Sequence, residues 1–293
     1  TDVFVTRLDP WFIPTPELIW STYLGGNETD RATAIALRSN GAPIIVGTTD
    51  SSDFVGLSGA LGGQTDGFVA RLTNSGAWDS GSWVGGMNND YIYAVALDPS
   101  NNIWITGSTL SPNFPTTSVI QPSKSGKTDA FITKLNAAGT AVTVSTFIGA
   151  LGDDVATGIA LNATGYPIIT GYTDSAVSPL NLFPARPGAF QQTYGGGKSD
   201  GFITMMTPIL NSIVYSTYLG GNYEDRPYAI AVDDAGNAYV TGYTDSTTFP
   251  TEMPLYGTLN GLATDAFVTI LNETGKGLLF STYFGGSYYD EGR

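Results

Sequence analysis

The sequence predicts an all-β fold, a β-propeller of four-stranded antiparallel blades with about four full blades and one half blade. The first observation is a repeated marker, Asp-x-Phe-[Val/Ile], whose copies are 64, 63, 71 and 65 residues apart. A second marker, Gly-Gly or Gly-Ala, follows each copy in the same phase, with an Asp five residues beyond its first glycine. The third observation is short β-rich stretches separated by Gly- and Pro-containing turns. A fixed period holding four strands is the pattern of a propeller blade.

Each period contains four predicted strands, called a, b, c and d in chain order. In the clearest copy they lie near 228–232, 238–243, 266–271 and 278–283. The repeat units, within one domain or domain segment spanning 1–293, are 2–65, 66–128, 129–199, 200–264 and a partial unit 265–293. The chain opens at strand c and then runs a-b-c-d four times, which predicts 18 strands. Because an unpaired strand edge attracts another strand, we expect neighbouring copies, or the rest of a longer parent chain, to complete the first blade.

Two residue patterns indicate how the strands pack. Strand a alternates small and branched side chains, as in 34–37, 94–97, 158–161 and 229–232, which suits a strand on the crowded side of a blade. Burying a phenylalanine is worth about 1.5–3 kcal/mol, so we assign to the core the five that follow Asp-x: Phe4, Phe68, Phe131, Phe202 and Phe267.

The composition excludes several kinds of function. The net charge of -14 argues against nucleic acid or an anionic membrane as partner and suits a soluble extracellular protein. No apolar run is long enough for a membrane-spanning helix. The chain has no cysteine and no histidine, which removes the thiolate nucleophile, the commonest general base and the commonest metal ligand. We therefore expect no catalytic residues and no enzyme activity.

Recurrent aspartates fall on one predicted face, the face of the b–c and d–a loops. They begin strand c, as Asp66 does, or end the Gly-Gly loop, as Asp225 does, while Asp245 and its equivalents follow strand b. Carboxylates in every blade could bind calcium, and the pair Asp153 and Asp154 is the best candidate. The favoured interpretation is that they accept backbone N–H bonds in tight turns, with no cofactor.

The third b–c loop, 176–199, is the longest and the best candidate for a ligand contact. Its aromatic and Arg side chains are typical contact anchors. The candidates are Phe183, Arg186, Phe190 and Tyr194. The tyrosines Tyr91, Tyr223, Tyr288 and Tyr289 are predicted on the same face. The alternative is that this loop only packs over its own blade.

Three sequence segments, STYLGG, AIAVDDAGNAYVTGYT and DAFVT, resemble the SBBP-type β-propeller repeats of bacterial and archaeal surface proteins. The resemblance implies a secreted or cell-surface protein and indicates no specific ligand. Three functions remain open: a structural, assembly or adhesive module, a lectin-like propeller that binds surface glycans, and a glycan-cleaving enzyme. The last is disfavoured because a glycosidase needs two carboxylates flanking one bond, whereas these acids are spread evenly over the repeats.

Overall fold

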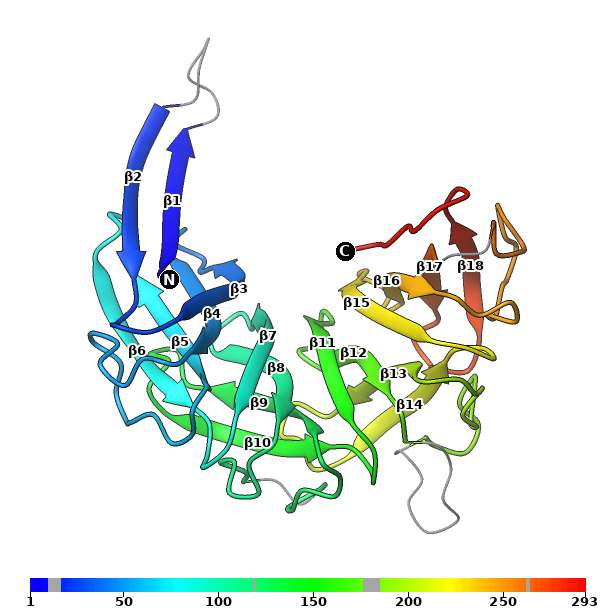
Figure 1. Ribbon diagram of the computed structural model, residues 1–293, viewed down its shortest axis with the longest axis horizontal. Coiled ribbons are helices and arrows are strands. Elements are labelled where there is room, and N and C mark those ends of the chain that lie inside the picture. Colours follow the sequence, from blue (N-terminus) through cyan, green and yellow to red (C-terminus); the bar gives the residue numbers. More distant parts are fainter. Residues whose placement is uncertain (10–16, 118–119, 176–184, 262–263) are drawn as a thin grey trace. The chain divides into compact units, whose positions relative to one another are not determined.

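The computed structural model describes residues 1–9, 17–117, 120–175, 185–261 and 264–293. These residues form eighteen strands, as the sequence predicts, in one two-stranded and four four-stranded sheets (Figure 1). No helix in the described part of the chain is long and apolar enough to cross a membrane. The all-β fold and its propeller blades are therefore confirmed.

The two-stranded sheet pairs strands c and d of the first blade, and each later sheet holds strands a to d in chain order. The strands are β1 (Val3–Asp9) and β2 (Glu17–Leu24); β3 (Asp30–Leu37), β4 (Pro43–Thr49), β5 (Asp66–Leu72) and β6 (Trp78–Val84); β7 (Asp90–Leu97), β8 (Ile103–Thr109), β9 (Asp129–Leu135) and β10 (Val142–Ile148); β11 (Asp154–Leu161), β12 (Pro167–Thr173), β13 (Asp200–Met206) and β14 (Ile213–Leu219); β15 (Asp225–Val232), β16 (Ala238–Thr244), β17 (Asp265–Leu271) and β18 (Leu278–Phe284).

A glycine in strand b lies opposite the phenylalanine of strand c. In the last blade Gly242 pairs with Phe267, and Gly47 pairs with Phe68 in the same way. Strand a carries a β-bulge at this level, which brings the Arg226 carbonyl so close that a Cβ on Gly242 would lie 2.0 Å from it. Only glycine fits under the bulge without moving the backbone.

The residue inserted by the bulge links two blades. Thr33 of β3 donates a hydrogen bond of 2.8 Å to the Ile92 carbonyl of β7. Thr157 of β11 makes the same 2.8 Å bond to the Pro227 carbonyl of β15. Within each of these two pairs of blades, strand a of one blade therefore contacts strand a of the other.

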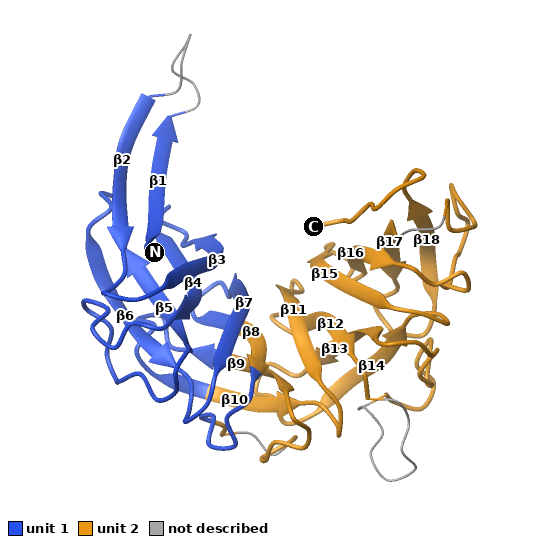
Figure 2. Ribbon diagram, viewed as in Figure 1, with its two compact units in different colours: residues 1–104, 109–115, 134–143 blue, residues 105–108, 116–133, 144–293 orange. Residues whose placement is uncertain are grey.

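The chain divides into two compact units (Figure 2). The first comprises residues 1–104, 109–115 and 134–143, and the second comprises 105–108, 116–133 and 144–293. In the first unit Phe54 packs on Phe68, with ring centroids 5.1 Å apart. In the second, Phe249 packs on Phe267 at 4.7 Å. Each unit thus has its own aromatic core.

The core prediction holds for four of the five phenylalanines and is wrong for Phe4. Phe68, Phe131, Phe202 and Phe267 are fully buried, whereas Phe4 is 70% exposed. Its strand, β1, pairs only with β2, so the strand b that covers the other phenylalanines is missing. The local sequence is the same, and the difference lies in the neighbouring strands.

Candidate functional sites

Two aspartates flank the first glycine of each Gly-Gly loop. One begins strand c of a blade and the other begins strand a of the next, so the prediction that they share a face is confirmed. A Cβ on Gly85 would lie 2.5 Å from Asp66 Oδ1 and 2.9 Å from Asp90 Oδ2. Any larger residue at this position would therefore clash with both carboxylates. We call these the junction acid pairs: Asp2–Asp30, Asp66–Asp90, Asp129–Asp154, Asp200–Asp225 and Asp265–Asp290.

Loop N–H groups hold these carboxylates, as the turn interpretation predicts. Gly62 N donates to Asp66 Oδ2 at 2.6 Å. Asp90 Oδ2 accepts from Gly86 N at 2.6 Å and from the Ser111 hydroxyl at 2.8 Å. Each loop is thereby tied to the first residue of the strand that follows it.

Burial raises the pKa of these carboxyl groups well above the ordinary aspartate value. Burial, and secondly the Asp90 charge, raise the pKa of Asp66 to about 6. Burial and the Asp225 charge raise the pKa of Asp200 to about 8. Burial also raises the pKa of Asp154 to about 7. The charged form of these groups is therefore disfavoured in the folded protein.

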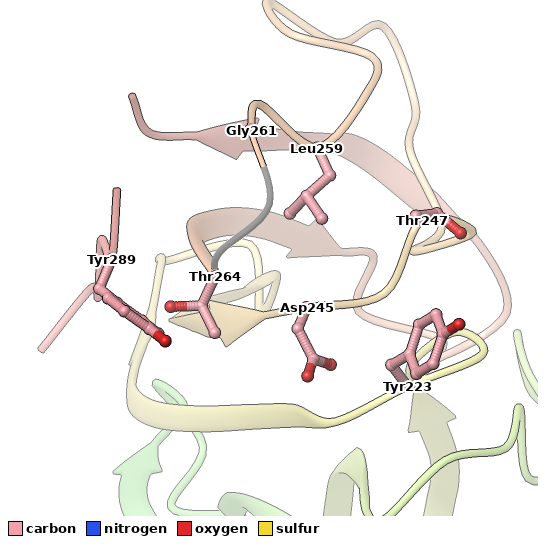
Figure 3. Close-up of a pocket in the computed structure, with 7 residues that line it drawn as sticks. All are labelled: Tyr223, Asp245, Thr247, Leu259, Gly261, Thr264 and Tyr289. Carbon is pink, nitrogen blue, oxygen red and sulfur yellow. The ribbon is translucent and has the colours of Figure 1, made fainter. Parts of the chain in front are cut away.

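A pocket of about 410 Å³ opens on the loops of the last blade (Figure 3). Tyr223 and Tyr289, which are 52% and 81% exposed, stand at its sides. The carboxylate of Asp245 lies between them, and the pocket is completed by Thr247, Leu259, Gly261 and Thr264. Aromatic walls with a few polar groups are typical of small-molecule sites.

The carboxylates around this pocket differ in how much of their charge is compensated. Glu224 forms ion pairs with Lys198 at 3.1 Å and Arg226 at 2.7 Å. Asp245 accepts a hydrogen bond from Glu224 N through one oxygen and has no ion pair among the described residues. Asp245 therefore supplies the negative charge of the pocket and would disfavour an anionic ligand.

The predicted contact loop lies in the second unit, and Phe183 is outside the described residues. Arg186 is exposed, and Phe190 packs against the buried cluster around Phe267. Tyr194 is half-buried, edge-on to Tyr218, with ring centroids 6.0 Å apart. The contact role of these side chains stays a prediction.

The calcium candidates lie at different depths. Asp154 is fully buried and accepts from Ala150 N at 2.7 Å, whereas Asp153 is half-buried and donates its backbone N–H to Asp174 Oδ1. Among described residues, no three Asp or Glu side chains gather as a metal site would require. Calcium binding at Asp153 and Asp154 remains a prediction that this geometry does not favour.

The open half blade leaves a groove in the first unit. A hollow of about 260 Å³ is lined by residues of β1, β3 and β4, among them Phe4, Val5 and Ile45. Ile35 and Leu37 of β3 are 58% and 65% exposed, although their counterparts in β7 are half-buried. This apolar surface lies where another blade would supply its strand a.

The sheets and their repeated junctions define the class of protein: a β-propeller of four-stranded blades. Residues 214–250 match the family of SBBP β-propeller repeats. No curated protein matches the sequence. A crystal structure described as a candidate gluconolactonase is similar at 14% identity and a TM-score of 0.33, over 77% of this chain. The chain spans 60% of that structure's length.

Sequence reasoning found part of the pocket. It placed Tyr223 and Tyr289 on the face of the pocket and placed Asp245 directly after strand b. It missed Thr247, Leu259 and Thr264, which carry no repeated signal. It also missed the pairing of aspartates, although the constant phase of the two Asp series could have indicated it.

Proposed function

We propose that the chain is a non-catalytic structural and assembly module of an extracellular or cell-surface protein. Its half blade, β1 and β2, would be completed by strands a and b of another SBBP-type repeat. The observation that carries the proposal is the exposure of Phe4, whose equivalents in the complete blades are all buried.

Three features of the half blade fit such strands. Phe4 requires a glycine opposite, as Gly242 lies opposite Phe267. The groove beside β3 is lined mainly by apolar residues, which suits packing against strand a of another blade. An open strand edge is a template for a further strand.

The burial of two junction acid pairs is consistent with a non-catalytic role. A glycosidase needs two carboxylates that flank the scissile bond. The members of the pairs Asp66–Asp90 and Asp200–Asp225 are 0–1% exposed, and the pocket presents the single carboxylate of Asp245. These four buried aspartates are therefore not accessible to a polysaccharide.

A fusion tests the completion of the half blade. In the last blade, residues 225–264 supply strands a and b and lead directly into Asp265, so a copy of 225–264 placed before Asp2 would supply the missing strands. We expect a higher Tm, a lower solvent accessibility of the Phe4 side chain, and loss of concentration-dependent association. The control fusion carries Gly→Val at the copied position of Gly242.

Light scattering on the protein without the fusion shows whether the missing strands come from neighbouring copies or from a longer chain. Association that increases with concentration, and that the fusion abolishes, indicates neighbouring copies. A monomer in which the fusion alone raises the Tm indicates a further part of a longer chain. A monomer whose Tm and Phe4 accessibility are unchanged by the fusion would overturn the proposal.

A second candidate function, binding of a neutral carbohydrate, is favoured by the pocket of Figure 3. Its two exposed tyrosines can stack on a sugar ring, and Asp245 and Thr247 can accept and donate bonds to hydroxyl groups. The loop positions that correspond to Tyr223 are Glu28, Asn88, Gly152 and Tyr288, so the first three loops lack this tyrosine.

A glycan array tests this candidate. We expect a neutral glycan to be retained, and retention to fall about tenfold or more in Tyr223→Ala and Asp245→Asn, since each removes a hot-spot contact. Tyr23→Ala, which removes a tyrosine that is 78% exposed and far from the pocket in sequence, is the control. Phe190→Ala and Tyr194→Ala test the long loop. Retention of no glycan excludes the candidate, and cleavage abolished by Asp245→Asn would make the protein an enzyme.

A further inference from the structure

In two of the junction acid pairs, both aspartates have a buried side-chain oxygen without a hydrogen-bond partner. In Asp66–Asp90, the Oδ2 atoms accept loop hydrogen bonds, whereas neither Oδ1 atom has a hydrogen-bond donor. Asp200 and Asp225 repeat this arrangement. All four residues are 0–1% exposed, so these oxygens do not face bulk water. A buried carboxylate oxygen that accepts nothing is costly.

We propose that each of these two pairs is a buried proton-binding site, in which one proton taken from solvent joins the two carboxyl groups. The shared proton provides a donor to the unpartnered oxygen and leaves the pair with one negative charge instead of two. Two adjacent buried carboxylates cannot both ionise without strong repulsion. The resulting O–H···O⁻ bond is of the strong, charge-assisted kind.

The hydrogen bonds indicate which member holds the proton. Asp90 accepts from the Gly86 N–H and the Ser111 hydroxyl, and a threonine hydroxyl also favours its charged form. Asp66 is held by the backbone N–H groups of Gly62 and Gly63, with no hydroxyl donor among its hydrogen bonds to described residues. Asp90 is therefore the carboxylate and Asp66 the acid.

The second pair repeats the asymmetry. Asp225 accepts from Gly221 N at 2.7 Å and from the Ser246 hydroxyl at 2.8 Å, whereas Asp200 accepts from Gly195 N at 2.5 Å. In both pairs the aspartate that begins strand c holds the proton, and the one that begins strand a holds the charge.

Among the described residues, no ion pair joins a Lys or Arg side chain to these four aspartates. The charge of Asp90 contributes to the raised pKa of Asp66. The Asp200–Asp225 pair is faced by the hydroxyl-bearing rings of Tyr194, Tyr218 and Tyr283 and by the carboxylate of Asp245. Calcium would take about six to eight oxygen ligands, and no described group of three acidic side chains lies here.

The third junction provides a matched control. Asp129 Oδ1 accepts from Gly126 N at 2.8 Å. Its Oδ2 accepts from Ser125 N at 2.8 Å and from Gln121 Nε2 at 2.7 Å. Both oxygens of Asp129 therefore have donors, so an amide at this position would place NH₂ against an N–H group.

The experiment compares Asp66→Asn, Asp200→Asn and Asp129→Asn by Tm across pH, beside ¹³C NMR titration of the aspartate carboxyls in the unmodified protein. Asparagine at 66 or 200 imitates the protonated acid, so we expect an unchanged Tm at acidic pH and a raised Tm at alkaline pH. Asp129→Asn should lower the Tm at every pH. The NMR titration should show two strand-c carboxyls with a pKa well above the ordinary aspartate value, about 6 for Asp66 and about 8 for Asp200.

Two results would overturn the proposal. One is an NMR titration in which every aspartate ionises near its ordinary pKa, a readout that needs no variant to fold. The other is a Tm that rises with added calcium and loses this response in Asp66→Asn and Asp200→Asn, which would show a metal site in place of the proton.

Discussion

The half blade β1–β2 and the complete blade β15–β18 have the same strand-c motif and opposite environments. Asp2-Val-Phe4 begins β1 as Asp265-Ala-Phe267 begins β17, yet Phe4 is 70% exposed and Phe267 is buried. Strand b, with Gly242 opposite Phe267, makes the difference. The neighbouring strand b therefore determines whether this phenylalanine is buried, and the strand-c motif by itself does not.

The largest expected effect comes from truncating these two phenylalanines. Phe267→Ala should lower the free energy of unfolding by about 3–5 kcal/mol, because it leaves a cavity in a closed core. Phe4→Ala should change it by less than about 0.5 kcal/mol, because the ring is already in water. Urea unfolding of the two variants measures the difference, and equal losses would show that Phe4 is covered in solution.

The pH dependence should distinguish closed junctions from the open one. The folded pKa of Asp66 and Asp200 is raised to about 6 and about 8, so the folded state binds more protons than the unfolded state above pH about 4. The stabilisation from the bound proton is therefore full below pH about 4 and is lost as pH rises through the folded pKa, on the order of 3 kcal/mol for Asp66 and more for Asp200.

The half blade supplies the control for this pH effect. Asp2 has a side chain 49% exposed, so its junction is open to water. Asp2→Asn should leave the pH profile of the Tm unchanged, whereas Asp66→Asn should flatten it. A Tm that rises steadily from mildly acidic to alkaline pH would contradict the assignment.

The glycine beneath the strand-a bulge should be intolerant of a side chain. Gly242→Ala places a Cβ 2.0 Å from the Arg226 carbonyl and should cost about 1–3 kcal/mol through overpacking. Gly257→Ala is the control, because its nearest neighbour would be Pro254 at 3.5 Å. Similar Tm values for both variants would show that the bulge relaxes.

The smallest expected effect concerns the bonds between blades. Thr33→Val and Thr157→Val each remove one hydrogen bond to the next strand a and should each cost about 1 kcal/mol. Thr6→Val, on the half blade, removes only a bond to the exposed Ser21 hydroxyl and should cost less. Equal costs at Thr6 and Thr33 would argue against an inter-blade role.

The sequence predicts most of the fold because the same short motifs mark the start of the same strands in every repeat. The phase of Asp66, Gly85 and Asp90 is sufficient to predict the strand order and the shared face of the acids. It does not predict that Asp66 and Asp90 become partners, because that contact depends on how one blade meets the next. The prediction that Phe4 is buried fails for the same reason, because its burial depends on a neighbouring strand that the local sequence does not specify.

Hydrogen–deuterium exchange of the monomeric chain, compared between β1 and β17, tests the central claim most directly. An open half blade predicts that amides of β1, with a partner strand on one side, exchange far faster than those of β17, which lies between β16 and β18. Protection of β1 equal to that of β17 would contradict an edge that is available to strands of another repeat.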